Sequence, residues 1–114
     1  MARTLIINLE AGLPTANEAL LRLDYELQQA QQQGATLVKV IHGYGSSGVG
    51  GVLRDAIQAA LRRKQNDGKI RAFVAGENWR VSDEATWAIL KKFAELKEDR
   101  DLGRGNKGIS IVVL

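Results

Sequence analysis

A glycine-rich segment that follows a short apolar run is the part of the sequence best suited to chemistry. It contains the only histidine, His42, and glycine at positions 43, 45, 48, 50 and 51, and Arg54 follows shortly after. Glycine permits positive φ angles and a close approach of the backbone to another molecule. A helix that begins near Val52 would direct unpaired N–H groups and the positive end of its dipole at this segment. The pattern predicts a loop that binds an anion such as a phosphate; the alternative is a connection that is only flexible.

Basic side chains are concentrated in the same part of the sequence. Residues 36–72 carry seven Lys or Arg against two Asp or Glu, whereas the whole chain has a net charge of +3. Such a surface would attract a polyanion, and a solvated helix face is the simpler alternative. The candidate phosphate-binding residues are Lys39, His42, Gly43, Tyr44, Gly45, Ser46, Ser47, Gly48, Gly50, Gly51, Arg54, Arg62, Arg63 and Lys64.

Glu10 and His42 are the candidate catalytic residues. A histidine that joins a strand to a loop either pins the loop through hydrogen bonds to the backbone or contacts a phosphate or scissile group directly, and both interpretations stay open. Glu10 ends an earlier apolar run, so a carboxylate and an imidazole at one sheet edge could share a water or a divalent ion. One Glu and one His make a weak metal site, so no tightly bound metal and no cofactor are predicted, except a divalent ion if the protein is a nuclease.

Two further features have alternative interpretations. Tyr44 could stack on an unpaired base or pack against its own loop. Residues 99–107 have the polar, glycine-containing composition of a mobile loop. The alternative is that Arg104 and Lys107 of this loop extend the basic surface.

The elements that position these residues alternate between strands and helices. In order, the pattern predicts a strand at residues 5–9, a helix capped by Thr15 and Glu18 and ended by Gly34, a strand at 37–41, a helix at 52–65, a strand at 70–74, a helix capped by Ser82 within 82–99, and a strand at 109–114. A right-handed crossover makes the first two strands parallel, so residues 10–12 and 42–51 should share one sheet edge. The spacing of Trp79, Trp87 and Phe93 predicts that they are buried in or beside the third helix.

Size and composition indicate one α/β domain, residues 1–114. The chain has no cysteine, which excludes disulfides and thiolate metal sites. No secretion signal and no apolar run of membrane-spanning length is evident, so we expect a cytoplasmic protein that does not contact a membrane.

The motifs resemble the small MutS-related (Smr) domain family. The matching segments are LIINLEAGLPTANEAL, the signature His42-Gly43-x-Gly45, the helix entry GVLRDAIQAAL and the final strand GISIVVL, which together cover nearly the whole chain. The resemblance implies a two-layer sandwich like the C-terminal domain of translation initiation factor three. Its four-stranded mixed sheet carries two main helices in β-α-β-α-β-β order, here with a helix added at about residues 82–99. It also implies binding to DNA or RNA, including branched or ribosome-associated nucleic acid, and in many members endonuclease activity.

The sequence departs from the family pattern at the end of the first strand. The family's Leu-Asp-x-His-Gly motif aligns with residues 9–12, where Glu10 retains the acid but no histidine is present. The leading hypothesis is therefore a nucleic-acid-binding domain in which catalysis is residual or lost. The alternatives are an active endonuclease that uses Glu10 and His42, and a protein-interaction or oligomerisation module that uses the added helix.

Overall fold

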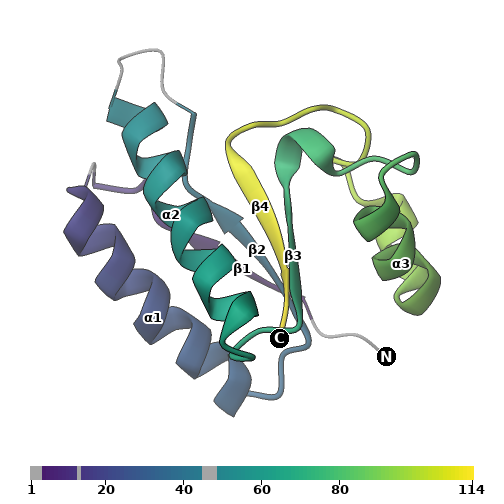
Figure 1. Ribbon diagram of the computed structural model, residues 1–114, viewed down its shortest axis with the longest axis horizontal. Coiled ribbons are helices and arrows are strands. Elements are labelled where there is room, and N and C mark those ends of the chain that lie inside the picture. The colour runs from purple at the N-terminus through teal and green to yellow at the C-terminus, as the bar shows by residue number, and fades with distance from the viewer. Residues whose placement is uncertain (1–3, 13, 45–48) are drawn as a thin grey trace.

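The computed structural model describes residues 4–12, 14–44 and 49–114, which form a mixed four-stranded sheet with helices on both faces (Figure 1). The elements in order are β1 (Thr4–Asn8), α1 (Ala16–Gln32), β2 (Leu37–Ile41), α2 (Val49–Asn66), β3 (Ala72–Ala75), the 3-10 helix η1 (Gly76–Asn78), α3 (Glu84–Lys92), the 3-10 helix η2 (Ala94–Glu98) and β4 (Ile109–Val113). The strand order is β1-β2-β4-β3; β1 and β2 are parallel, and β4 is antiparallel to both of its neighbours. This confirms the predicted fold class.

Helix α1 begins and ends as its sequence predicts. The Thr15 side chain accepts a hydrogen bond from the Glu18 amide, and the Glu18 carboxylate accepts one from the Thr15 amide, which forms a capping box. The helix ends at a residue with positive φ, Gly34, at +77°. Its buried stripe is Ala19, Leu23, Leu27 and Ala30.

Helix α2 begins earlier than expected. It starts at Val49 rather than near Val52, so Gly50 and Gly51 lie in its first turn. Glycine costs about 1 kcal/mol per helical position relative to alanine. Tertiary packing overrides this propensity, because Leu53, Ile57 and Leu61 bury one face of the helix against the sheet.

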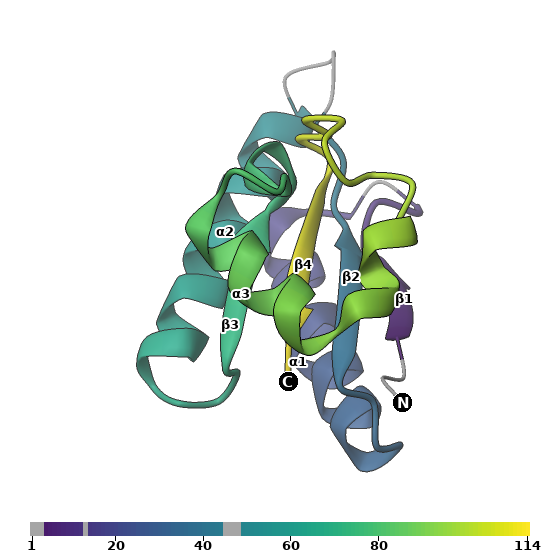
Figure 2. The same ribbon diagram turned by 90° about the vertical axis from the view of Figure 1, so that its right-hand side faces the viewer.

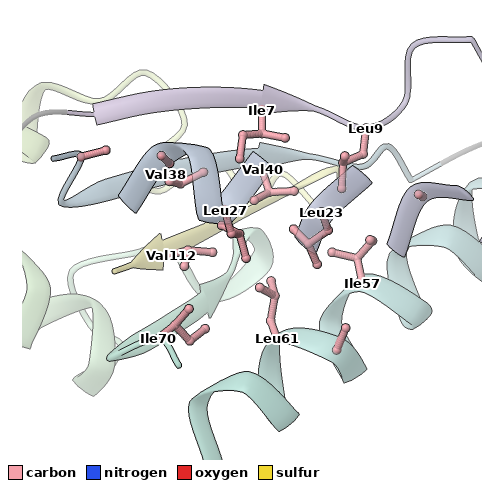
Figure 3. Close-up of a cluster of buried hydrophobic side chains, with 14 of the residues drawn as sticks. Ile7, Leu9, Leu23, Leu27, Val38, Val40, Ile57, Leu61, Ile70 and Val112 are labelled. Atoms are coloured by element: carbon pink, nitrogen blue, oxygen red, sulfur yellow. The ribbon is translucent and has the colours of Figure 1, made fainter. Parts of the chain in front are cut away.

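The sheet is buried on both faces. One core cluster joins α1 and α2 to alternate residues of the sheet, including Val38, Val40 and Val112 (Figure 3). The second cluster joins Trp79 and α3 to the intervening residues, such as Leu37 and Ile111. Consecutive β2 residues thus face different layers, so Lys39 points away from α1 and α2.

The segment between β3 and β4 packs on the second face. Asp83 rather than Ser82 caps α3, and a 3-10 helix follows it. Trp79 is fully buried as predicted, but the predicted burial of Trp87 is wrong, since it is 45% exposed. The buried side chains of α3 are Thr86, Ile89 and Leu90. Trp87 follows Thr86 in the sequence, so its side chain projects about 100° away from that of Thr86 around the helix axis.

None of the helices in residues 4–12, 14–44 and 49–114 is both long and apolar enough to cross a bilayer.

Candidate nucleic-acid interface

The ends of β1 and β2 lie side by side, as the crossover argument predicts. The two strands pair in parallel up to Asn8 and Ile41, and the Leu9 amide donates to the Ile41 carbonyl at 2.7 Å. Residues 10–12 and the start of the glycine loop therefore meet at one edge of the sheet.

Gly43 is required by both its backbone conformation and its surroundings. Its φ is +75°, and a Cβ atom at this position would overlap the carboxylate of Glu10. The amides of His42 and Gly43 both donate to the Gly108 carbonyl at 3.0 Å. These two amides are thus bonded within the protein, which corrects the expectation that they face an anion. The predicted binding residues Gly45, Ser46, Ser47 and Gly48 lie outside the described residues.

His42 pins the loop from inside the protein. Its side chain has no exposed area, Nδ1 lies 3.0 Å from the Gly43 carbonyl, and Nε2 lies 3.0 Å from Ser110 Oγ. Because a carbonyl only accepts, Nδ1 carries the proton and Nε2 accepts from the serine hydroxyl. Burial lowers the pKa of His42 below its usual 6.5, so the ring is neutral at pH 7. Both nitrogens are occupied, which favours the structural interpretation over a catalytic base.

Glu10 lies near enough to His42 for its charge to favour the protonated ring, although burial has the larger effect and lowers the pKa of His42. The two side chains do not face the same solvent, since Glu10 lines a cleft on the sheet face opposite α1 and α2, whereas His42 is buried and does not line it. Within residues 4–12, 14–44 and 49–114, no group of three or more His, Asp or Glu side chains could hold a metal ion.

Arg54 is half-buried and already paired. Its guanidinium contacts the carboxylate of Glu77 in η1 and that of Asp55 at 3.1 Å, and its side chain is 19% exposed. Arg54 Nε and Glu77 Oε1 nevertheless have no hydrogen-bond partner in the described structure. Arg54, predicted as a phosphate contact, is thus engaged within the protein, because η1 places Glu77 against the first turns of α2.

Lys39 lies on the face of the sheet opposite α1 and α2, so it does not belong to the basic surface of α2. Its ammonium contacts Asp99 Oδ1 at 2.7 Å and Asp101 Oδ2 at 2.6 Å, and the residue is 9% exposed. Desolvation would lower the pKa of Lys39, but the hydrogen bonds that its ammonium donates to Asp101 and Asp99, together with their negative charges, outweigh it and raise the pKa above 10.5. Lys39 therefore holds the segment before β4 onto the sheet, which corrects its assignment as a phosphate contact.

The remaining predicted basic residues lie at the far end of α2. Arg62 and Arg63 are exposed, whereas Lys64 contacts Asp24 of α1 at 2.5 Å. Gly50 and Gly51 lie in the first turn of the same helix, and this turn carries no acidic residue. A positive helix end and two exposed arginines thus occur at opposite ends of one helix.

A cleft of about 400 Å³ opens beside the glycine loop. Its apolar walls come from Ile6, Ile41 and Tyr44, and its polar groups include Glu10 and Arg100. Tyr44 is 52% exposed. The cleft therefore presents an aromatic ring and side chains of both charges to solvent.

The segment from residue 99 to 108 forms the other side of this cleft. It runs past the end of β2 on its way to β4 (Figure 2), and Lys107 Nζ lies 5.1 Å from the centroid of the Tyr44 ring. Arg100, Arg104 and Lys107 are exposed. This arrangement places Lys107 beside Tyr44, and the alternative that Arg104 and Lys107 extend the basic surface stays a prediction. Arg100 was missed, although an antiparallel β4 necessarily brings the preceding residues to the end of β2.

Comparisons with known proteins agree with this architecture. The sequence model of the Smr domain matches residues 11–91. The crystal structure of the Smr domain of Thermus thermophilus MutS2 is similar with a TM-score of 0.57 and 25% sequence identity, over 99% of this chain and 98% of that one. A search of curated proteins gave no match. Because the family model spans most of the chain and the fold agrees throughout, the chain belongs to the Smr domain family.

Proposed function

We propose that this Smr domain binds nucleic acid at the surface formed by residues 42–44, the start of α2 and residues 99–108. Family membership supports the ligand class. The observation that carries the location is the contact of Lys107 with the Tyr44 ring, because it joins a cation of the second loop to an exposed aromatic of the first. Cations beside an aromatic ring are the combination that binds backbone phosphates and bases.

Charge at this surface supports the same conclusion. The two acids of residues 99–108, Asp99 and Asp101, both pair with Lys39, so this cluster keeps one net negative charge. The exposed cations Arg100, Arg104 and Lys107 outnumber it, and the loop together with Lys39 carries a net charge of +2. The first turn of α2 adds a positive dipole end without an acidic side chain.

Arg62 and Arg63 extend the proposed surface along α2. The helix rises 1.5 Å per residue, so Arg62 is about 17 Å from Gly51 along the axis. This distance corresponds to roughly five base pairs of duplex. Nucleic acid that contacts the start of α2 can thus contact these arginines as well.

Endonuclease activity through Glu10 and His42 is not part of this proposal. A general base needs an accessible atom within hydrogen-bond reach of its substrate. His42 is buried and both of its ring nitrogens have partners. Binding is therefore the function that the geometry supports best.

Fluorescence anisotropy with a labelled DNA or RNA oligonucleotide tests the proposal. Each phosphate contact contributes a slope of about −0.7 to −0.9 to log affinity against log salt. We expect the double variant R100E/K107E to bind more than tenfold more weakly. The slope of log affinity against log salt should become less steep by the amount that about two phosphate contacts contribute. Lys91→Glu, which changes an exposed lysine at the end of α3, is the control and should alter neither. Binding that is absent or independent of salt, or equal losses in the two variants, would contradict the proposal.

A further inference from the structure

We infer that the cleft beside Tyr44 takes one unpaired nucleotide, whose base stacks on the tyrosine ring while its strand follows the cations of residues 99–108. This inference rests on the proposed function and specifies it further. It predicts a preference for nucleic acid with an extruded or single-stranded base over a fully paired duplex.

The apolar walls of the cleft are the first argument. Tyr44 and Ile6 are 52% and 67% exposed, and both line the cleft with Ile41. An exposed ring beside aliphatic walls offers a flat, dry surface that any base can cover. A base inside a duplex has both faces covered by its neighbours, so only an unpaired base can reach this ring.

The polar groups of the cleft are the second argument. The side chains of Asp101 and Asn106 are already engaged, with Lys39 and each other, and Asn106 also accepts from the Gly108 amide. In contrast, the Glu10 carboxylate and the Arg100 guanidinium have no hydrogen bond or ion pair with any other described side chain. A carboxylate accepts from the amino groups of bases, and a guanidinium donates to phosphate oxygens.

The size and boundaries of the cleft are the third argument. Its volume of about 400 Å³ lies within the range of roughly 300 to 1,000 Å³ that is usual for small-molecule sites. Lys107 rests over the Tyr44 ring, and Arg104 is exposed on the same loop. The space therefore suits one nucleotide, with cations outside it for the phosphates of its neighbours.

The experiment compares two duplexes that differ by one unpaired residue. A labelled 20-base-pair duplex and the same duplex with a single bulged 2-aminopurine are titrated with the protein at one salt concentration. Stacking on one aromatic ring should favour the bulged duplex by about 5- to 150-fold. The 2-aminopurine fluorescence should also fall as the base stacks.

Matched tyrosine variants identify the ring. Tyr44→Ala should abolish both the preference for the bulged duplex and the fluorescence change, and Tyr44→Phe should keep both. Tyr25→Ala, which removes the 61% exposed tyrosine of α1, should behave as the wild type. Circular dichroism confirms that each variant is folded. Free 2-aminopurine nucleoside monophosphate should bind much more weakly than the bulged duplex, because it lacks neighbouring phosphates.

The possible outcomes separate the two proposals. Equal affinity for both duplexes, or a preference that survives in Tyr44→Ala, overturns the nucleotide cleft and leaves nucleic-acid binding intact. Equal binding of the free nucleotide also overturns the inference, because the cleft would then be a site for the monomer. No binding of either duplex overturns both proposals.

Discussion

Lys39, in the middle of the sheet, contacts Asp99 at 2.7 Å although 60 residues separate them in the sequence. Asp99 also accepts a hydrogen bond from the indole of buried Trp79, and Asp101 contacts the same lysine. These contacts fix the start of residues 99–108, which then reach the cleft and Tyr44. A partly buried ion-pair cluster, whose Lys39 and Asp101 line the cleft, thus sets the position of the proposed binding surface.

Replacement of Lys39 tests this relationship. Lys39→Met leaves two partly buried carboxylates without their cation, so we expect a loss of about 2 to 4 kcal/mol in the free energy of unfolding. Urea denaturation followed by circular dichroism measures it. Lys91→Met, at an exposed position, should change stability by no more than about 0.5 kcal/mol. A similar small change in Lys39→Met would show that the pair contributes little.

His42 predicts a pH dependence near neutrality. Its pKa is lowered in the folded state, mainly by burial, whereas the unfolded chain keeps the usual value of 6.5. The unfolded state therefore binds the proton more readily, and the free energy of unfolding should fall as the pH drops below about 6.5. Denaturation curves between pH 8 and 5 measure this fall, which His42→Asn should reduce.

Nuclear magnetic resonance of the same ring is an independent check. The chain has a single histidine, so its imidazole signals need no assignment by mutagenesis. We expect a neutral ring protonated at Nδ1 at pH 7. A ring that titrates at 6.5 or above in the folded protein would contradict the buried, doubly bonded position.

Addition of one methyl group at Gly43 should lower the stability of the fold substantially. Gly43→Ala combines the strain of a positive φ angle, about 1 to 2 kcal/mol, with displacement of the Glu10 side chain. Gly34→Ala is the control, because Gly34 has φ +77° with no atom within 4 Å of the added Cβ. Thermal denaturation should show a larger loss of stability for Gly43→Ala than for Gly34→Ala. In the double variant G43A/E10A this extra loss should disappear. If it persists without the Glu10 side chain, the overlap with Glu10 is not its cause.

Arg54 and Glu77 give a prediction that links stability to binding. Glu77→Gln removes the negative charge that holds the guanidinium, so we expect slightly lower stability but tighter binding of nucleic acid, by about three- to tenfold. Arg54→Ala should lower stability by about 1 to 3 kcal/mol, because the buried Glu77 loses its partner. Anisotropy and urea denaturation of both variants are the measurements. Weaker binding by Glu77→Gln would show that Arg54 has only a structural role.

The parts of the fold that depend on local sequence were predictable. The capping box of Thr15 and the positive φ of Gly34 fix α1 through residues within one turn of each end. The parallel pairing of β1 and β2 followed from the length of one crossover. The start of α2 was missed because packing of Leu53 and Ile57 outweighs the weak helix propensity of two glycines.

The candidate site was harder to predict because its contacts are distant in sequence. Nothing near Lys39 or Arg54 indicates that Asp99 or Glu77 will neutralise it. Conversely, the proximity of Lys107 to Tyr44 depends on the order β1-β2-β4-β3, in which the last strand enters the sheet beside β2. Residue types indicated the chemistry, and only the topology decided which cations are available.

The position of β4 between β2 and β3 also has a consequence for biosynthesis. Within the described sheet, β4 alone joins β3 to the other strands, so the four-stranded sheet cannot assemble while residues 109–113 are still inside the ribosome. Until they emerge, the apolar edges of β2 and β3 remain open to other chains. Folding should therefore be a late, concerted event, and chains that stop before Ile109 should aggregate or be degraded.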